Sequence, residues 1–214
     1  VEIEELPAYM SAPAAMAEDA IEIHPGTPNV YFDCGVIKGE ETAPIFDKAK
    51  YTVEDDFYVG RQPHMPLEPD VGFAYMDEEG KLIVHSKSVA LHFHHSMTAE
   101  GIGVAPEKYV IVQNNSGGTF GYKFSPTMEG LLGVAALVTG KPVYLEFNVA
   151  QQFAYTGKRS PFFMNVKFAA DEKGKLQAME GDFSVDHGPY CEFGDLLTVR
   201  GTQFMGAGYN IPNI

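Results

Sequence analysis

The chain has 214 residues, of which 45% are hydrophobic, 21% are charged and 12% are aromatic, with no Trp. This composition is typical of a packed globular protein, and a chain of this length can bury a core without disulfides. Fifteen Lys and Arg residues stand against 29 Asp and Glu residues, which gives a formal charge of −14. Because such a surface repels phosphate backbones, the composition argues against a nucleic-acid partner.

The sequence also argues against membrane insertion and secretion. No apolar run approaches the roughly 20 residues that span a bilayer, and the N-terminus has no basic region of the kind that opens a signal peptide. Cys34 and Cys191 lie far apart without the spacing of a ligand pair, so we expect two buried or idle thiols in a reducing compartment. Both ends of the chain suggest a segment cut from a longer protein.

The first elements in chain order are a connecting segment and a set of strands. Residues 5–32 alternate Ala-rich and Pro-rich pieces, which predicts a connection with one short helix around residues 14–21. The pattern then changes, and it predicts strands over residues 51–59, 72–76, 82–85 and 109–113, with a hairpin turn at 77–80 and a short helix at 88–97.

The clearest local signature is a strand, a glycine-rich loop and a helix. The strand at 109–113 runs into residues 117–121, Gly-Gly-Thr-Phe-Gly, which we call the glycine-rich loop. Ser125 suits the N-cap of the following helix and Pro126 suits its first position, while Gly140 is expected to end it.

The remaining elements are a strand over residues 143–149 and a hairpin of strands 165–170 and 176–185. Strands and helices mix without regular βαβ alternation, which favours an α+β fold with a layered mixed sheet and packed helices. We expect residues 1–47 to connect from a preceding domain and residues 48–214 to form one domain.

The glycine-rich loop is the best candidate for ligand binding. Gly lacks Cβ and tolerates positive φ, so backbone N–H groups there can approach a ligand closely. A helix that follows such a loop adds the positive end of its dipole. The pattern is neither GxGxxG nor a P-loop, so the residues alone indicate either a cradle for an electron-rich ligand or a plain structural turn.

The loop and its flanks resemble the molybdenum hydroxylase (xanthine oxidase) family. The matching stretches appear in the family's order: residues 61–69 with Leu-Glu, 117–123, 139–143, 156–161, 186–188 and the Tyr-Asn-Ile-Pro-Asn-Ile ending. They cover most of the chain after Lys50. Within the family, the aldehyde-oxidising members of sulfate-reducing bacteria are the most similar, so the fold is expected to be part of the molybdenum-cofactor-binding region of a larger enzyme.

The resemblance implies roles for particular residues. The backbone of Phe120 and Gly121 would face the metal and pterin, with Gly118 and Thr119 shaping the approach. Purine-oxidising members have a Glu four residues after the loop Phe. Here Phe124 stands at that position, as an apolar wall that fits a small aldehyde better than a purine, although it is also readable as a core residue.

A second departure concerns a Gln that xanthine oxidases place near the metal. The corresponding stretch here has no Gln, so either the backbone of Val89 and Ala90 or a water would fill that space. We expect a structural role for Arg200, because Val199 precedes it where the family's arginine motif has Phe.

Three other groups of residues invite functional readings that we set aside. His92, His94 and His95 are expected to be surface or core histidines rather than metal ligands, because no Cys pair lies near them. Asp186 and His187 are adjacent and would face opposite ways on a strand. The acidic run at residues 54–56 is expected to be a solvated strand edge. Tyr122 and Lys123 are expected to help hold the loop.

The implied activity is oxidation of aldehydes to carboxylic acids with water, using molybdopterin cytosine dinucleotide with molybdenum. Electrons would leave through [2Fe-2S] clusters to a carrier such as flavodoxin or ferredoxin. The base Glu is expected beyond Ile214 and the cluster domains before the chain, so we expect no catalytic residue and no metal-ligating residue within it. The segment alone should be inactive, and the parent protein should be a cytoplasmic homodimer.

Three alternatives stay open. A related molybdenum hydroxylase could act on an N-heterocycle or carbon monoxide. A non-catalytic module could keep the glycine-rich loop for ligand binding. A structural or subunit-interaction domain could use the acidic surface.

Overall fold

The structure is a computed structural model that describes residues 2–190 and 193–214, so Cys191 lies outside the described residues. By internal contacts the chain forms two compact units, one of residues up to Arg61 together with Ser160–Ile214, and one of Gln62–Arg159. Each unit has its own sheet, and the α+β fold class is confirmed. The expected division between residues 47 and 48 stays a prediction.

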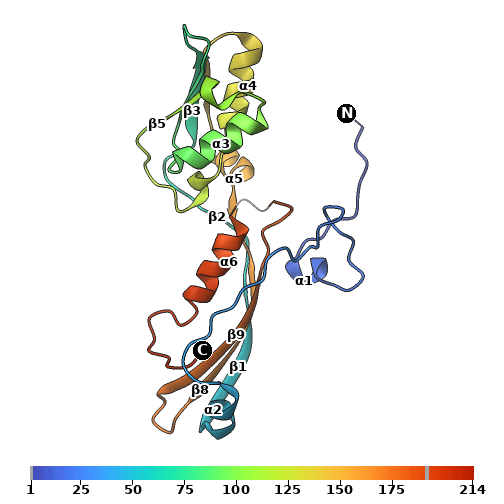
Figure 1. The fold of residues 1–214 in the computed structure, drawn as a ribbon, viewed down its shortest axis with the longest axis vertical. Helices are drawn as coiled ribbons and strands as arrows, with labels where there is room; N and C mark the ends of the chain where they lie inside the picture. Colours follow the sequence, from blue (N-terminus) through green and yellow to red (C-terminus); the bar gives the residue numbers. More distant parts are fainter. Residues whose placement is uncertain (1, 191–192) are drawn as a thin grey trace. The chain divides into compact units, whose positions relative to one another are not determined.

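The unit of residues 62–159 is a four-stranded sheet with helices on one face (Figure 1). Its strands are β3 (Val71–Met76), β4 (Leu82–Ser86), β5 (Tyr109–Gln113) and β6 (Val143–Glu146), in the order β5-β4-β3-β6. Only β4 and β5 are parallel, and α3 (Leu91–Gly101) makes the crossover that a parallel pair requires. A second helix, α4 (Glu129–Thr139), packs on β3 and β4.

The core of this unit forms where alternate strand residues meet the two helices. Its buried members are Ala74, Leu82, Val84, Ala99, Tyr109, Met128, Leu132, Ala136 and Phe147. Gly72 allows the closest approach, because a Cβ built there would lie 2.7 Å from the His85 carbonyl oxygen and 2.8 Å from Leu132 Cδ1. At the edge, the two-residue strands β2 (Gln62–Pro63) and β7 (Lys158–Arg159) pair with each other.

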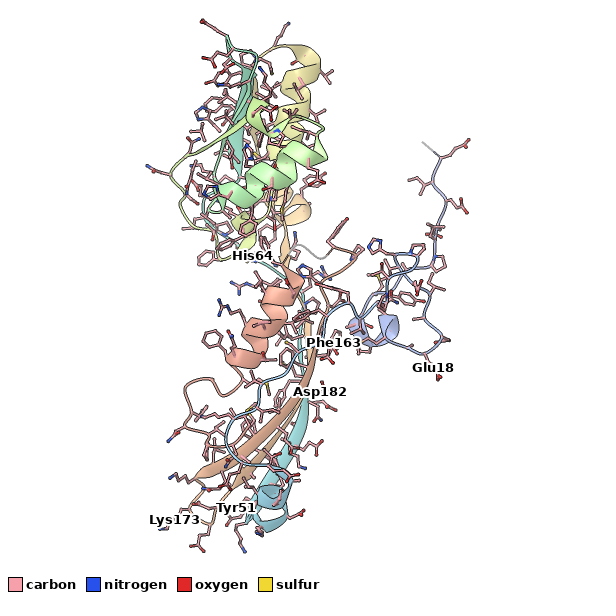
Figure 2. The ribbon with its side chains drawn as sticks, viewed as in Figure 1. Glu18, Tyr51, His64, Phe163, Lys173 and Asp182 are labelled. Atoms are coloured by element: carbon pink, nitrogen blue, oxygen red, sulfur yellow. The ribbon has the colours of Figure 1, made fainter. Side chains whose placement is uncertain are left out.

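The other unit contains a three-stranded antiparallel sheet. Its strands are β1 (Tyr51–Val59), β8 (Phe162–Ala170) and β9 (Leu176–Val185), in the order β1-β8-β9. Tyr51 and Lys173 mark the same end of this sheet, at the start of β1 and in the β8–β9 turn (Figure 2). The acidic run at 54–56 lies on β1, whose residues are all exposed, as expected.

Within its described residues, the same unit has three helices. The helix α2 (Ala43–Lys48) places Phe46 against Ala169 and Ala178 in a small core, and Gly201 of α6 (Gly194–Gln203) allows that helix to approach Phe183. The first helix, α1 (Ala12–Ala15), begins at the N-cap Ser11. None of the helices in the described part of the chain is both long and apolar enough to cross a membrane.

The strands at 51–59 and 109–113 have the predicted bounds, and the two predicted hairpins are confirmed. The helix predicted from Ser125 was placed wrongly, because α4 begins at Glu129 after the 3-10 helix Tyr122–Phe124. Gly140 ends α4 in the left-handed conformation, as predicted.

Other predicted bounds shift by a few residues. The helices expected at 14–21 and 88–97 lie at Ala12–Ala15 and Leu91–Gly101. The strand expected at 143–149 stops at Glu146, since Asn148 caps the unpredicted helix α5 (Val149–Tyr155) by a capping box. A 3-10 helix at Pro106–Lys108 was also not predicted.

Candidate cofactor-binding site

The glycine-rich loop connects β5 to the 3-10 helix Tyr122–Phe124. Three of its residues have φ in the left-handed region: 128° at Gly118, 49° at Phe120 and 107° at Gly121. Gly adopts such angles freely, whereas a residue with a Cβ is strained there by roughly 1–2 kcal/mol. Phe120 is therefore strained, and it is also 62% exposed. Backbone strain of this kind concentrates at binding and active sites.

The backbone N–H groups of the loop fall into two sets. Gly117 N–H donates to Glu68 Oε2 at 2.7 Å, and Gly121 N–H donates to Thr119 Oγ1 at 3.1 Å. The N–H groups of residues 118–120, between them, have no hydrogen-bond acceptor among the described residues. Consecutive N–H groups without an acceptor are available to an anion or another electron-rich group.

Val89 and Ala90 lie just before α3 and are tied to the end of the loop. Val89 N–H donates to the Lys123 carbonyl oxygen at 3.2 Å, and Ala90 N–H donates to Ser88 Oγ at 3.1 Å. Both N–H groups are thus used within the protein. A ligand at this segment would meet carbonyl groups and side chains, so the role expected for Val89 and Ala90 stays a prediction.

The three residues that follow the loop point to different surroundings. Tyr122 and Lys123 are 5% and 2% exposed, whereas Phe124 is 47% exposed. The contacts of Tyr122 and Lys123 described below confirm that they hold the loop. Phe124 is not a core residue of this unit, and its role as an apolar wall of a substrate pocket stays a prediction.

Glu68 is the acceptor at the start of the loop. Its Oε2 accepts from Gly117 N–H and, at 3.1 Å, from Lys123 Nζ, while Oε1 accepts from Lys87 Nζ at 2.7 Å. Partial burial opposes ionisation of this carboxyl. The hydrogen bonds from Lys87, Gly117 and Lys123 outweigh that effect and lower the pKa of Glu68 to about 2. The carboxylate is therefore charged throughout the physiological range.

Asp70 holds the other side of Tyr122. Tyr122 Oη donates to Asp70 Oδ1 at 3.0 Å, and Thr127 Oγ1 donates to Oδ2 at 2.7 Å. Gln152 completes the network, because its Oε1 accepts from Asp70 N–H and its Nε2 donates to Tyr122 Oη. Burial raises the pKa of Asp70, and burial together with the Asp70 carboxylate raises the pKa of Tyr122. The phenol stays protonated and serves as the donor.

Glu129 anchors the segment on which Val89 and Ala90 lie. Its Oε1 accepts from Ser86 Oγ at 2.5 Å and lies 3.6 Å from His94 Nδ1, and its Oε2 accepts from Thr127 N–H and Met128 N–H at 2.7 and 3.1 Å. Burial disfavours the charged form, but His94 and the Ser86 hydroxyl outweigh it and lower the pKa of Glu129. Ser86 Oγ in turn accepts from Ser88 N–H at 2.9 Å.

His64, which is labelled in Figure 2, lies beside Gly121 at the far end of the loop. Its Nδ1 is 3.3 Å from the Gly157 carbonyl oxygen, which only accepts, so Nδ1 carries the hydrogen. Its ring lies 5.5 Å from the Tyr122 ring, and Nε2 lies 3.8 Å from a Cβ built on Gly121. Burial lowers the pKa of His64 against the effect of the Gly157 bond, and the Arg159 charge lowers it further.

A strained, accessible loop with open N–H groups, fixed by the half-buried carboxylate of Glu68, is suited to binding a polar cofactor. Residues 23–214 match the family described as the molybdopterin cofactor-binding domain. The chain belongs to that family. In this molybdopterin cofactor-binding domain, the loop belongs to the half of the fold made by residues 62–159.

Individual relatives agree with the family. The chain is 67% identical over its whole length to an aldehyde oxidoreductase of Megalodesulfovibrio gigas, and 29% identical to the nicotinate dehydrogenase large molybdopterin subunit of Eubacterium barkeri. It spans 24% of the first protein and 50% of the second.

Two solved structures cover the whole chain. They are aldehyde oxidoreductases from Desulfovibrio gigas and Desulfovibrio desulfuricans, with TM-scores of 0.92 and 0.91 and identities of 67% and 60%. The chain covers 24% of each. These matches confirm the family that the sequence resembles.

The histidine cluster of the domain has structural surroundings. His94 is 1% exposed and faces Glu129, while His95 Nε2 is 2.9 Å from the Tyr109 carbonyl oxygen. Within the described residues, no group of three or more His, Cys, Asp or Glu side chains is arranged to hold a metal ion.

The other candidates set aside above also have simple partners. Asp186 lies 3.6 Å from Arg61, and His187 Nδ1 lies 3.1 Å from Ser160 Oγ. Arg200 donates to Gln203 on the same helix at 2.8 Å. Cys34 is a free, half-buried thiol.

A large cavity lies in the other unit of the domain. It has a volume of about 930 Å³ and lies between β9 and the N-terminal segment. Its described lining contains no Lys or Arg but six carboxylate residues: Asp33, Glu40, Glu41, Glu180, Asp182 and Asp186. Like charges disfavour an anionic dinucleotide there, so the cofactor site is better sought at the glycine-rich loop.

The site residues missed from the sequence are acidic. Glu68 lies in a stretch that carries the family resemblance, yet no pattern indicates that it would bind the loop 49 residues later. Asp70 and Glu129 are likewise single carboxylates. The acidic first turn of α4 signals Glu129, and no pattern in the sequence signals Asp70.

Proposed function

We propose that this chain is the part of a molybdenum-dependent aldehyde oxidoreductase that presents the glycine-rich loop to the molybdopterin cofactor. The observation that carries the proposal is the run of open N–H groups at residues 118–120 beside the strained Phe120. Such a run fits the electron-rich oxygen and sulfur atoms of a pterin dithiolene ligand better than it fits an apolar ligand. The 67% and 60% identity to aldehyde oxidoreductases supports the aldehyde as substrate.

The residues of the chain would bind and orient. The N–H groups of residues 118–120 would donate to the cofactor, and Gly118 and Gly121 supply the positive φ angles of the loop that presents them. When bound, the cofactor supplies the oxidation of the aldehyde to the acid, with oxygen from water and two electrons passed onward. Phe124, with its exposed ring, would wall the substrate space and exclude water from it.

The rest of the proposal concerns the whole protein. Molybdopterin cytosine dinucleotide is the proposed form of the cofactor, with [2Fe-2S] clusters in other domains. The proposed electron acceptor is a carrier such as flavodoxin or ferredoxin, and the proposed assembly is a cytoplasmic homodimer. The general base would be a Glu outside this chain, so the chain alone is expected to be inactive.

The first test is metal analysis of the full-length protein from its native host. We expect molybdenum together with iron, and oxidation of small aldehydes with an artificial electron acceptor. A folded, freshly purified protein without molybdenum would contradict the proposal. Activity on an N-heterocycle but on no aldehyde would be consistent with the proposed cofactor and would contradict the proposed substrate.

A second test addresses the loop itself. Thr119→Val removes the hydroxyl that accepts from Gly121 N–H, whereas Thr119→Ser keeps it. If the loop holds the cofactor, the Val variant should lose molybdenum on gel filtration while the Ser variant keeps it. Equal molybdenum content in both variants and the unchanged protein would argue against this role of the loop.

A further inference from the structure

We propose that Glu68 is the positioning residue of the cofactor site, because its carboxylate sets both the glycine-rich loop and the segment that carries Val89 and Ala90. This inference rests on the proposed function, since it names what fixes the geometry of the same site. Nothing in it requires Glu68 to touch the cofactor or the substrate.

Residues 64–68, which we call the supporting segment, run along the whole length of the loop. A Cβ built on three of the loop glycines would contact every second residue of that segment. The pairs are Gly117 with Glu68 at 3.1 Å, Gly118 with Pro66 at 3.9 Å and Gly121 with His64 at 3.8 Å. The approach is closest at Glu68, where a Cβ on Gly117 would also lie 3.3 Å from Glu68 Cδ.

The Glu68 carboxylate joins three stretches of the chain. Glu68 Oε2 holds Gly117 at the start of the loop and Lys123 just after its end, while Oε1 holds Lys87. Lys87 Nζ also donates to the Asn115 carbonyl oxygen at 2.6 Å. The two ends of the loop and the segment before α3 are therefore tied to one side chain.

Lys123 depends on the Glu68 carboxylate, 3.1 Å away, as its ion-pair partner. Lys123 is 2% exposed, and its other contacts are Ser116 Oγ at 3.3 Å and the Tyr122 ring at 5.6 Å. Neither carries a charge, and Asp70, whose pKa the Lys123 charge lowers, forms no direct ion pair with it among the described residues, so Glu68 is the carboxylate in contact with the ammonium group. Because a buried ion without a counter-ion is strongly disfavoured, loss of the Glu68 carboxylate should displace Lys123 and the loop end with it.

Lys123 connects this arrangement to the second candidate segment. Its backbone carbonyl accepts from Val89 N–H, so a shift of Lys123 moves Val89 as well. Lys87, two residues before Val89, is held by Glu68 directly. A single carboxylate thus controls both stretches at which a cofactor contact is proposed.

The test uses the full-length protein with Glu68→Gln, Glu68→Ala and the control Glu78→Gln, a Glu that is exposed and makes no contact with the loop. Gln can still accept from Gly117 N–H but cannot neutralise two lysines, whereas Ala loses both functions. Hydrogen exchange of residues 114–124 is followed by mass spectrometry in protein made with and without molybdenum in the medium. We expect exchange of the hydrogen-bonded amides of this stretch, those of Asn114, Gly117, Tyr122 and Phe124, to rise about tenfold for Gln and about a hundredfold for Ala in both preparations, with α4 unchanged.

Two further readouts separate positioning from general stability. In the loaded enzyme, Glu68→Gln should lower kcat for the aldehyde more than it raises KM, and it should change the electron paramagnetic resonance signal of the reduced molybdenum centre. Lys87→Met should speed the hydrogen exchange of residues 86–90, because it removes the hydrogen bonds of Lys87 to Glu68 and Asn115. The Gly117 amide should stay protected, because its bond to Glu68 remains.

The outcomes distinguish this inference from the proposed function. Unchanged exchange of residues 114–124 in both Glu68 variants would overturn the inference, even if the protein contains molybdenum. Loosened exchange with an unchanged molybdenum signal would also overturn it, since the loop would then not set the cofactor. Absence of molybdenum from the unchanged protein would refute the proposed function, while loosened exchange in the Glu68 variants would still show that Glu68 fixes the loop.

Discussion

Substitution of Glu129 offers the sharpest test of how buried hydrogen bonds stabilise the cofactor-binding site. Its carboxylate is 3% exposed and accepts from Ser86 Oγ and from the N–H groups of Thr127 and Met128, with His94 Nδ1 at 3.6 Å. Glu129→Ala removes every acceptor at once. Glu129→Gln keeps one carbonyl oxygen for the two N–H groups and presents an amide that Ser86 Oγ can accept from.

The expected losses differ between the two variants. Leaving the partners of a buried charge unpaired destabilises by roughly 3–5 kcal/mol, whereas replacing the charge with a neutral hydrogen-bonding group should cost about 1–2 kcal/mol. Because each 1.4 kcal/mol is about tenfold in an equilibrium constant, exchange of α4 and β4 amides should accelerate by about a hundredfold or more for Ala. About tenfold is expected for Gln.

The assay is hydrogen exchange by mass spectrometry on the full-length protein, because local opening is defined there even when global unfolding is not two-state. Glu100→Ala is the matched control, since Glu100 is an exposed residue of α3 and should stay within about 0.5 kcal/mol of the unchanged protein. If Glu129→Ala behaved like Glu100→Ala, or if Gln were as damaging as Ala, the reasoning from unpaired buried donors would be wrong.

Three further predictions concern pH, packing and capping. The pKa of Glu68 is lowered to about 2, so its stabilisation of the loop should be complete above the ordinary Glu pKa of 4.5 and lost as the pH falls toward 2. The difference in hydrogen exchange of the loop between the unchanged protein and Glu68→Gln should therefore be constant from pH 5 to about 8. It should shrink below pH 5. Gly72→Ala should destabilise the protein by about 1–3 kcal/mol, because the added Cβ would lie 2.7 Å from the His85 carbonyl oxygen. The control Gly101→Ala has open space around it and should leave the protein unchanged or more stable. Thermal inactivation measures both. Asn148→Ala should cost about 1 kcal/mol and speed exchange in α5 about fivefold, since it removes the capping box; an unaltered α5 would show that packing alone holds this helix.

The fold was predictable where one physical signal dominates. Runs of β-branched and aromatic residues place β1 and β5, and a single Gly at 140 ends α4. The start of α4 was not predictable, because Ser125 and Pro126 form a good local start signal that the 3-10 turn overrides. Glu129 begins the helix instead, and it does so with a side chain that satisfies N–H groups preceding it in the chain.

The glycine-rich loop was predictable from the sequence, but the side chains that hold it in place were not. The Gly-Gly-Thr-Phe-Gly run shows in the sequence, and its positive φ angles follow from the glycines, although strained Phe120 does not. The contacts of Glu68 and Asp70 join residues 49 and 52 positions apart. No local period or spacing encodes pairings over that distance, because the sheet between them decides which side chains meet.

The exposed strand β1 has a consequence for handling the protein. It forms one edge of its sheet in the described chain, and Tyr51, Val53 and Phe57 on one of its faces are all more than half exposed. A long edge of this kind is a template for pairing with another strand, and the charges at residues 54–56 are what interrupts its apolar pattern. The isolated 214-residue chain should therefore remain dispersed at neutral pH, whereas a variant with neutral amides in place of Glu54, Asp55 and Asp56 should form β-rich aggregates.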